Sequence, residues 1–285
     1  MRSKGAALPA MLLWFHFSVQ AQTPLSAGDI APAVVVTVPG PSLGSEQAAT
    51  ILLPAGYAES RQRYPVLYLL HGGGQDHTAF AMRKWFRAQA SRELIIVTPS
   101  VGESWYVNSA SDPKAKYEDF VVRDLIEYVD SRYRTVASRN GRAVAGVSMG
   151  AWGAMLLGLK HPHLFGAVGA FSAPYGISRQ DPKMDMTSRT QQRFGAPETP
   201  ERRERDPGTL ANTIPVDSAP MLYLACGNED MFVADNRAFV QRLTTRKIPY
   251  EYRELSPFGH SWELWDDQLV IFLDMLSRRW SQGPR

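Results

Sequence analysis

Residues 146–150 read Gly-Val-Ser-Met-Gly, and they join an apolar run typical of a β-strand to a run typical of a helix. A sharp strand-to-helix turn of this kind holds its serine in a strained conformation, with the hydroxyl exposed above a sheet. Gly146 and Gly150 are required because a side chain at either position would crowd the turn. The five-residue pattern is common by chance, but between a strand and a helix it predicts a nucleophile elbow at Ser148.

Strand and helix patterns alternate along the rest of the chain. Several strand runs are almost continuously apolar, as expected for parallel strands covered on both faces. The expected strands are 33–38, 48–53, 66–70, 94–97, 143–147, 167–171, 221–226 and 250–255. The expected helices are 78–90, 117–133, 149–160, 233–245 and 261–279. This alternation predicts an α/β fold with a doubly wound, mostly parallel sheet, helices on both faces and an antiparallel edge formed by the first two strands.

One segment, residues 175–220, interrupts the alternation. It is rich in Arg, Asp, Pro, Thr and Gln and has almost no apolar periodicity. Irregular segments of this length are rare in compact domains unless they form a lid or a binding loop. We therefore expect an insertion over one end of the sheet, within a single domain that covers residues 22–285.

The N-terminal residues 1–21 have the pattern of a signal peptide. Arg2 and Lys4 precede an apolar run at 6–19, and small residues occupy positions 19 and 21. The run is shorter than the roughly 20 residues of a membrane span. We expect a secreted or periplasmic protein without a membrane span in its mature chain, while an uncleaved anchor or a wrongly assigned start remains open.

Charge and cysteine content exclude several classes of function. Removal of the leader, which holds two basic residues and no acid, lowers the net charge from +3 to +1, so no nucleic-acid partner is expected. Cys226 is the single cysteine in the sequence, which excludes an internal disulfide and a cysteine-cluster metal site.

A glycine-rich loop follows the expected strand at 66–70, where residues 70–74 read Leu-His-Gly-Gly-Gly. In hydrolases with a nucleophile elbow, a loop at this position completes the oxyanion hole. We predict the Gly73 and Met149 backbone N–H groups as the two donors, with His71 orienting the loop. A phosphate-binding loop or a plain turn is the alternative, although the sequence matches no Walker A or dinucleotide motif.

His260 is the histidine best placed to act as a base, because it lies between the last expected strand and the last helix. The other histidines lie in the leader, before the serine or at the far end of the helix after it: His16, His71, His77, His161 and His163. Three acids follow the strand at 221–226, and of these we favour Asp230 over Glu229 and Asp235. His260 would take the serine proton and Asp230 would orient the imidazole, with no metal or organic cofactor.

Taken together, these motifs resemble the esterase D-like family of α/β-hydrolases, and the resemblance covers most of the chain after the leader. It rests on residues 70–74, Ser-Trp-Tyr at 104–106, Tyr-Glu-Asp-Phe at 117–120, residues 146–150, Cys-Gly-Asn-Glu-Asp at 226–230 and Gly-His-Ser-Trp at 259–262. The resemblance implies an α/β-hydrolase fold with Ser148, Asp230 and His260 as nucleophile, acid and base. Residues 151–152 read Ala-Trp where relatives often have a second glycine, and Gly-Gly-Gly replaces the cysteine-containing loop common in formylglutathione hydrolases.

The expected activity is that of a secreted serine carboxylester hydrolase acting on small-molecule or polysaccharide-linked esters, such as feruloyl or acetyl esters of carbohydrates. An acyltransferase of the mycolyltransferase kind would use the same triad, and a binding module that kept the fold is a third hypothesis. Trp105 and Tyr106 are predicted to stack on a sugar or an aromatic acyl group, with packing of their own loop as the alternative.

Overall fold

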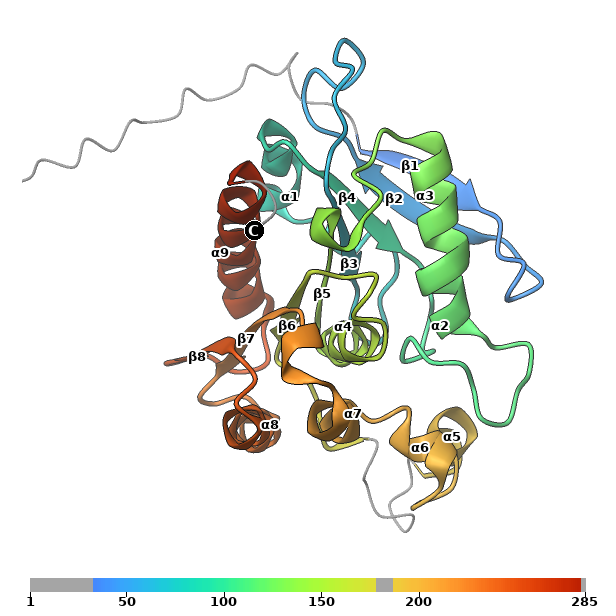
Figure 1. The fold of residues 1–285 in the computed structure, drawn as a ribbon, viewed down its shortest axis with the longest axis vertical. Helices are drawn as coiled ribbons and strands as arrows, with labels where there is room; N and C mark the ends of the chain where they lie inside the picture. The colour runs from blue at the N-terminus through green and yellow to red at the C-terminus, as the bar shows by residue number, and fades with distance from the viewer. Residues whose placement is uncertain (1–32, 178–186, 283–285) are drawn as a thin grey trace, which may run out of the picture.

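The computed structural model describes residues 33–177 and 187–282, so the predicted leader at 1–21 lies outside it. Within these ranges, eight strands form one sheet in the order β1-β2-β4-β3-β5-β6-β7-β8 (Figure 1). The strands are β1 (Val34–Val38), β2 (Gln47–Leu52), β3 (Val66–Leu70), β4 (Ile95–Pro99), β5 (Arg142–Val147), β6 (Ala167–Phe171), β7 (Met221–Gly227) and β8 (Tyr250–Leu255). β2 pairs antiparallel with β1 and β4, and the remaining pairs are parallel. The predicted fold class and its antiparallel edge are confirmed.

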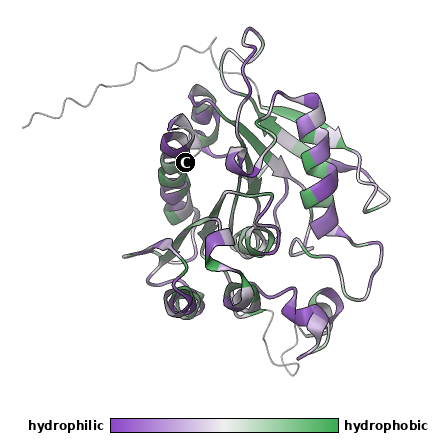
Figure 2. Ribbon diagram, viewed as in Figure 1, coloured by the Kyte–Doolittle hydropathy of each residue, from purple (hydrophilic) through white to green (hydrophobic). Residues whose placement is uncertain are grey.

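Helices cover both faces of the sheet, as predicted. One face carries α2 (Tyr117–Asp119), α3 (Ile126–Arg132), α4 (Met149–Lys160) and α8 (Val233–Arg246), and the other carries α1 (Lys84–Ala88) and α9 (Trp262–Ser281) (Figure 1). The strand period of two divides β3 between two cores: Tyr68 belongs to the core under α4, and Leu67 and Leu69 belong to the core under α9. Figure 2 shows the resulting apolar sheet, with helices that are apolar on one side.

Two predicted helices differ from the observed ones. The helix expected from residue 78 begins at Lys84, because the Asp76 carboxylate accepts hydrogen bonds from the Thr78 backbone N–H (2.8 Å) and hydroxyl (2.6 Å) and so stabilises a turn. The helix expected at 117–133 is divided into α2, a π-helical segment at Phe120–Leu125, and α3.

The described part of the 175–220 segment is more regular than expected. It contains α5 (Thr187–Phe194), α6 (Pro200–Arg203) and α7 (Pro207–Thr213). Thr199 and Asp206 cap α6 and α7, and α7 packs on α4. Both helices begin with a polar cap and a proline in the first turn, which stabilise a helix without apolar periodicity. The lack of that periodicity had suggested an irregular segment.

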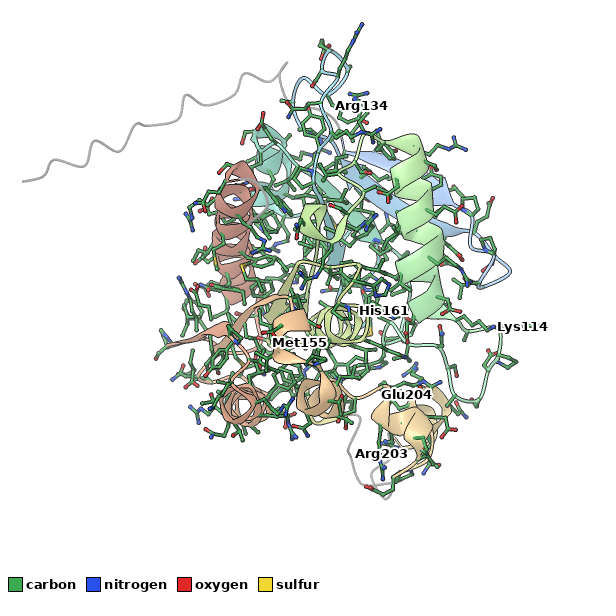
Figure 3. All side chains as sticks on the ribbon, viewed as in Figure 1. Lys114, Arg134, Met155, His161, Arg203 and Glu204 are labelled. Atoms are coloured by element: carbon green, nitrogen blue, oxygen red, sulfur yellow. The ribbon has the colours of Figure 1, made fainter. Side chains whose placement is uncertain are left out.

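Three arginines of this segment bind backbone carbonyl groups or a carboxylate. Arg205 Nε donates to the Asn108 carbonyl oxygen at 2.8 Å, and Arg202 Nη1 donates to the Gly195 carbonyl oxygen at 2.9 Å. Arg203 lies at the outer edge of the molecule (Figure 3) and pairs with Glu198 at 3.7 Å. The Arg205 contact holds the segment against the loop before α2, and the other two contacts lie within the segment. No helix among the described residues is long and apolar enough to cross a membrane.

Candidate active site

Ser148 lies in the turn between β5 and α4, with φ 54° and ψ −118°. This backbone conformation is costly for a non-glycine residue, so the surrounding structure must hold it. The Ser148 N–H donates to the Phe171 carbonyl oxygen at 2.9 Å. A Cβ at Gly150 would lie 2.1 Å from the Leu70 carbonyl oxygen, and one at Gly146 would lie 2.4 Å from the backbone of Gly150. Only glycine therefore fits on either side of the elbow.

The structure brings together the three side chains that the sequence singled out. His260 Nε2 lies 3.0 Å from Ser148 Oγ, and His260 Nδ1 lies 2.9 Å from Asp230 Oδ2. The Asp230 side chain is fully buried, whereas that of His260 is 20% exposed. When Nδ1–H donates to the carboxylate, Nε2 is left to accept the serine proton.

Backbone contacts between two loops set the distance between the acid and the imidazole. The Glu229 N–H donates to the Phe258 carbonyl oxygen at 3.0 Å, and the Asn228 N–H donates to the Leu255 carbonyl oxygen at 2.9 Å. A Cβ at Gly227 would lie 2.0 Å from the Phe258 carbonyl oxygen. Glycine at this position therefore permits the loop after β7 and the loop after β8 to lie against each other.

Asp230 is the acid that contacts His260. Burial acts to raise the pKa of Asp230, but hydrogen bonds from His260, Ser172 and the Phe232 N–H outweigh it and lower that pKa below its ordinary value. The carboxylate is thus charged at neutral pH. The Glu229 side chain is exposed, and the Asp235 carboxylate accepts the Gly176 N–H at 2.9 Å.

Two aromatic rings hold the imidazole of His260 edge-on. Phe232 lies 5.1 Å and Trp265 lies 4.8 Å from it, measured between ring centroids. The Trp265 indole N–H donates to Ser172 Oγ at 2.9 Å, and Ser172 has a positive φ of 57°. Sequence reasoning did not identify Ser172. Its position at the carboxyl end of β6, next to the strand of the nucleophile, is the signal that would have found it.

Two of the three glycine N–H groups at 72–74 already have protein acceptors. The Gly72 N–H donates to Gln75 Oε1 at 2.9 Å, and the Gly74 N–H donates to the Glu103 carboxylate. Within the described residues, the Gly73 N–H and the Met149 N–H donate to no protein group. A Cβ at Gly72 would lie 3.4 Å from Ser148 Cβ, so the loop lies against the elbow. The two predicted donors thus have unused hydrogens, and Gly72 places the loop beside the serine.

His71 is buried and holds the loop through both ring nitrogens. Nδ1 donates to the Gly72 carbonyl oxygen at 2.8 Å, and Nε2 accepts the Val101 N–H at 3.3 Å. Burial lowers the pKa of His71, which favours the neutral ring that this arrangement requires. These contacts agree with an orienting role for His71.

Trp105 and Tyr106 have different surroundings. Tyr106 is fully buried, and its hydroxyl donates to the His71 carbonyl oxygen at 2.9 Å, so it presents no surface for stacking on a substrate and supports the loop instead. Trp105 is half-buried and lies edge-on to Trp152 at 5.7 Å and to Phe194 at 5.9 Å. Phe194 of α5 was not anticipated, because no local pattern connects it to Trp105.

No group of three or more His, Cys, Asp or Glu side chains in the part of the chain that the structure describes is arranged to hold a metal ion. The polar groups at and beside the elbow are a hydroxyl, an imidazole, a carboxylate and two amide N–H groups. This set is suited to nucleophilic attack on a carbonyl carbon and to stabilisation of the oxyanion that forms.

Comparison with known proteins gives consistent results. A model of the family described as "Putative esterase" matches residues 40–274. Esterase Rv1288 of Mycobacterium tuberculosis (strain ATCC 25618 / H37Rv) is 32% identical over 248 residues, covering 77% of this chain and 53% of that protein. The acetyl esterase of Caldicellulosiruptor saccharolyticus is 25% identical over 221 residues, covering 74% of this chain and 83% of that protein.

Among solved structures, a ferulic acid esterase superimposes with a TM-score of 0.73 at 29% identity, covering 87% of this chain and 98% of that one. The chain spans about half the length of the mycobacterial relative, so the match describes one part of that protein.

Proposed function

Because this chain belongs to the "Putative esterase" family of carboxylic ester hydrolases, we propose that it is a serine esterase that forms an acyl-enzyme at Ser148. The observation that carries the proposal is the continuous hydrogen-bonded chain from Ser148 Oγ through His260 to Asp230, with distances of 3.0 and 2.9 Å. A serine hydroxyl is a weak nucleophile until an adjacent base removes its proton as it attacks.

In the proposed reaction, Ser148 Oγ bonds to the acyl carbon while His260 Nε2 takes the hydroxyl proton. The carbonyl oxygen becomes an oxyanion, which accepts hydrogen bonds from the Gly73 and Met149 N–H groups. Collapse of this intermediate breaks the bond to the alcohol oxygen, which takes the proton from His260. Water then attacks the acyl-enzyme by the same sequence of proton transfers and releases the acid. Asp230 stays ionised and stabilises the imidazolium.

The proposed substrates are acyl esters of carbohydrates, with acetyl and feruloyl groups as the acyl part. Two similarities support this choice: one relative is an acetyl esterase, and one similar structure is a ferulic acid esterase. The half-buried Trp105, which packs edge-on against the buried Phe194, supplies an apolar surface for an acyl group. We further propose that the protein is exported, on the basis of the leader pattern at residues 1–21.

The substitution Ser148→Ala tests the proposal. We expect the variant to fold as the wild type does and to lose at least ~10³-fold in kcat on p-nitrophenyl acetate, because the residual rate comes from binding and the oxyanion hole alone. A fluorophosphonate probe should label the wild type and leave the variant unlabelled. Full esterase activity in the variant would refute Ser148 as the nucleophile.

A sugar acceptor added to the same assay separates hydrolysis from acyl transfer. Both reactions share the acyl-enzyme and differ in whether water or an alcohol attacks it. We expect free acetate as the main product, and an acetylated sugar as the main product would establish an acyltransferase.

A further inference from the structure

A small pocket lies directly beside the oxyanion loop, outside the triad. Its volume is about 230 Å³. This is below the ~300 Å³ at which pockets for drug-sized ligands begin, so it suits a single small ring rather than an extended ligand. The residues that line it are Gly74, Gln75, Asp76, Thr78, Ala79, Met82, Arg83 and Trp262.

The pocket is connected to both halves of the catalytic machinery. Gly74 follows the proposed oxyanion donor Gly73, and Trp262 comes two residues after His260. The Trp262 ring packs on Trp265 at 5.3 Å, and Trp265 packs on the imidazole of His260 at 4.8 Å. Two successive ring contacts therefore link the wall of the pocket to the imidazole of His260.

Trp105 lies over the opposite face of the sheet from Trp262. Trp105 and Trp152 pack with the core under α4, whereas Trp262 packs with the core under α9. An ester bound at Ser148 extends in two directions, with its acyl part on one side of the reacting carbon and its alcohol part on the other. Because the alcohol part must approach His260, we assign the acyl part to the opposite side, where Trp105 is the half-buried aromatic residue.

The lining of the pocket combines apolar surface with unused hydrogen-bonding groups. Met82 is 75% exposed, and the half-buried Trp262 has the Arg83 guanidinium carbon over one face of its ring, 4.8 Å from the centroid. Among the described residues, the Gln75 amide nitrogen and Asp76 Oδ2 make no hydrogen bond. Such a mixture of aromatic, carboxylate and amide groups suits a ligand with several hydroxyl groups on an apolar ring.

The charge of the pocket limits the ligand further. The Arg83 guanidinium is paired with Asp266, at 3.1 Å from Nε to Oδ1 and 2.5 Å from Nη2 to Oδ2. Hydrogen bonds from the Thr78 hydroxyl and N–H lower the pKa of Asp76, so its carboxylate is negative at neutral pH. One uncompensated negative charge thus lines the pocket, which disfavours an anionic ligand.

We propose that this pocket binds the alcohol half of the substrate as a single neutral sugar ring, held by Trp262, Gln75 and Asp76. The inference rests on the proposed esterase function and specifies which half of the ester this face recognises. It predicts that changes in the pocket alter selectivity among alcohols and leave selectivity among acyl groups unchanged.

The first experiment fills the pocket from its exposed edge with Met82→Trp. Val35→Trp is the control, because Val35 is 64% exposed on the edge strand β1. The substrates are an acetylated methyl xylopyranoside, ethyl acetate and ethyl ferulate. The first two share an acyl group and the last two share an alcohol.

For Met82→Trp, we expect kcat/KM on the sugar acetate to fall by about tenfold or more, which corresponds to the loss of one aromatic contact and one buried ring. The values on ethyl acetate and ethyl ferulate should stay within about twofold of wild type, and the control should match wild type on all three. Equal losses on the sugar acetate and ethyl acetate, or a changed ratio of ethyl ferulate to ethyl acetate, would overturn the assignment. A wild type that hydrolyses none of the esters and resists the fluorophosphonate probe would instead contradict the proposed function.

The second experiment tests the charge with Asp76→Asn, which keeps an acceptor oxygen for the turn at Thr78. We expect this variant to improve kcat/KM severalfold for an acetylated methyl galacturonoside relative to its neutral galactoside counterpart. An unchanged ratio would overturn the preference for a neutral ring.

Discussion

Three hydrogen bonds from residues 101–106 hold the loop that carries Gly73. The Val101 N–H and the Tyr106 hydroxyl bind His71, and the Glu103 carboxylate accepts the Gly74 N–H. A Cβ at Gly73 would lie 3.4 Å from Glu103 Oε2, so this carboxylate lies against both glycines. We therefore propose Glu103 as a positioning residue for the proposed oxyanion donor Gly73.

Glu103→Ala should lower kcat by about tenfold with little change in KM, because a displaced donor weakens oxyanion binding more than ground-state binding. The effect should be smaller than the ~10²-fold or greater loss that follows removal of a donor. Glu103→Gln keeps an acceptor for the Gly74 N–H and should restore most of the rate. Steady-state kinetics on p-nitrophenyl acetate measures both, with the exposed Glu46→Ala as control. A rise in KM at unchanged kcat would argue against this role.

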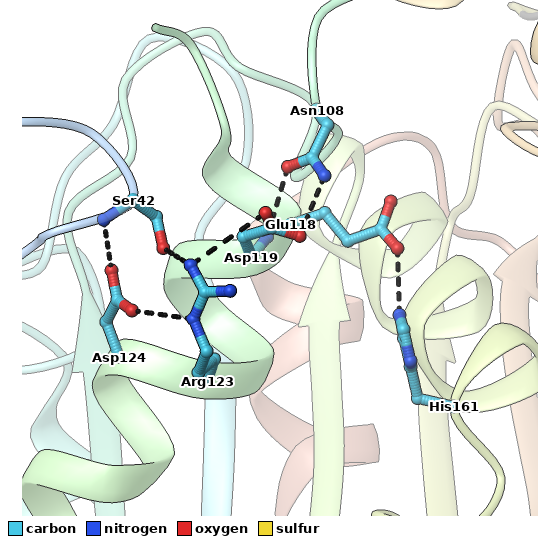
Figure 4. Close-up of polar contacts among 7 residues, drawn as sticks. All are labelled: Ser42, Asn108, Glu118, Asp119, Arg123, Asp124 and His161. Carbon is cyan, nitrogen blue, oxygen red and sulfur yellow. Dashed lines mark hydrogen bonds and ion pairs between the residues drawn. The ribbon is translucent and has the colours of Figure 1, made fainter. Parts of the chain in front are cut away.

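Among the elements, α4 carries Ser148 at its N-terminus and is held at its other end by a buried carboxylate. Glu118 of α2 accepts a hydrogen bond from His161 Nε2 at 2.8 Å (Figure 4). It also accepts one from Lys160 Nζ at 3.0 Å. Burial acts to raise the pKa of Glu118, but its bonds to His161 and Lys160 outweigh this and lower the pKa. Lys160, in the last turn of α4, also complements its dipole.

Glu118→Gln should lower the free energy of unfolding by about 1–3 kcal/mol at pH 7, since it replaces hydrogen bonds to a charged group. The native pKa of Glu118 lies below its ordinary value of 4.5, so its contribution is present above pH 4.5 and is lost as the pH falls through the native pKa. The difference between wild type and variant should therefore shrink below pH 4.5.

Urea unfolding between pH 7 and pH 3 measures this difference, and the exposed Glu127→Gln on α3 serves as its control. Esterase activity should stay close to that of the wild type, because Glu118 binds the end of α4 opposite Ser148. A constant stability difference down to pH 3 would contradict the assigned pKa direction.

Across the whole molecule, the sheet places its one cysteine out of reach of solvent. Cys226 is fully buried near the end of β7, beneath the loop that carries Asp230. Burial, followed by the nearby Asp230 charge, raises the pKa of its thiol to about 12. A thiolate is the reactive form of cysteine, so the folded protein protects this residue both sterically and electrostatically.

Cys226 should therefore report global unfolding. At pH 8 we expect no reaction with Ellman's reagent in native buffer and complete reaction of one thiol per chain in guanidinium chloride. The midpoint of thiol exposure should coincide with that of the far-ultraviolet circular dichroism signal. Reaction of the native protein at the rate of the denatured chain would show that β7 opens locally.

Local sequence pattern was sufficient to predict the strands, most of the helices between them and the elbow at Ser148. Each of these depends on neighbouring residues: apolar runs specify buried strands, and the paired glycines specify the turn. The helix start at Lys84 was missed because a turn stabilised by Asp76 competes with helix formation at residues 78–83, and this competition leaves no periodic signal.

The side chains around the triad depended on contacts between distant parts of the chain. Sequence order singled out His260 and a short list of acids, but only the pairing of the loops after β7 and β8 placed Asp230 at the imidazole and Glu229 in solvent. The burial of Tyr106, the support from Glu103 and the pocket at Trp262 likewise join residues that lie 29 to 188 positions apart. A periodic pattern reports which face of one element is buried, whereas a site at the end of a sheet is formed by loops whose meeting depends on the packing of all the elements between them.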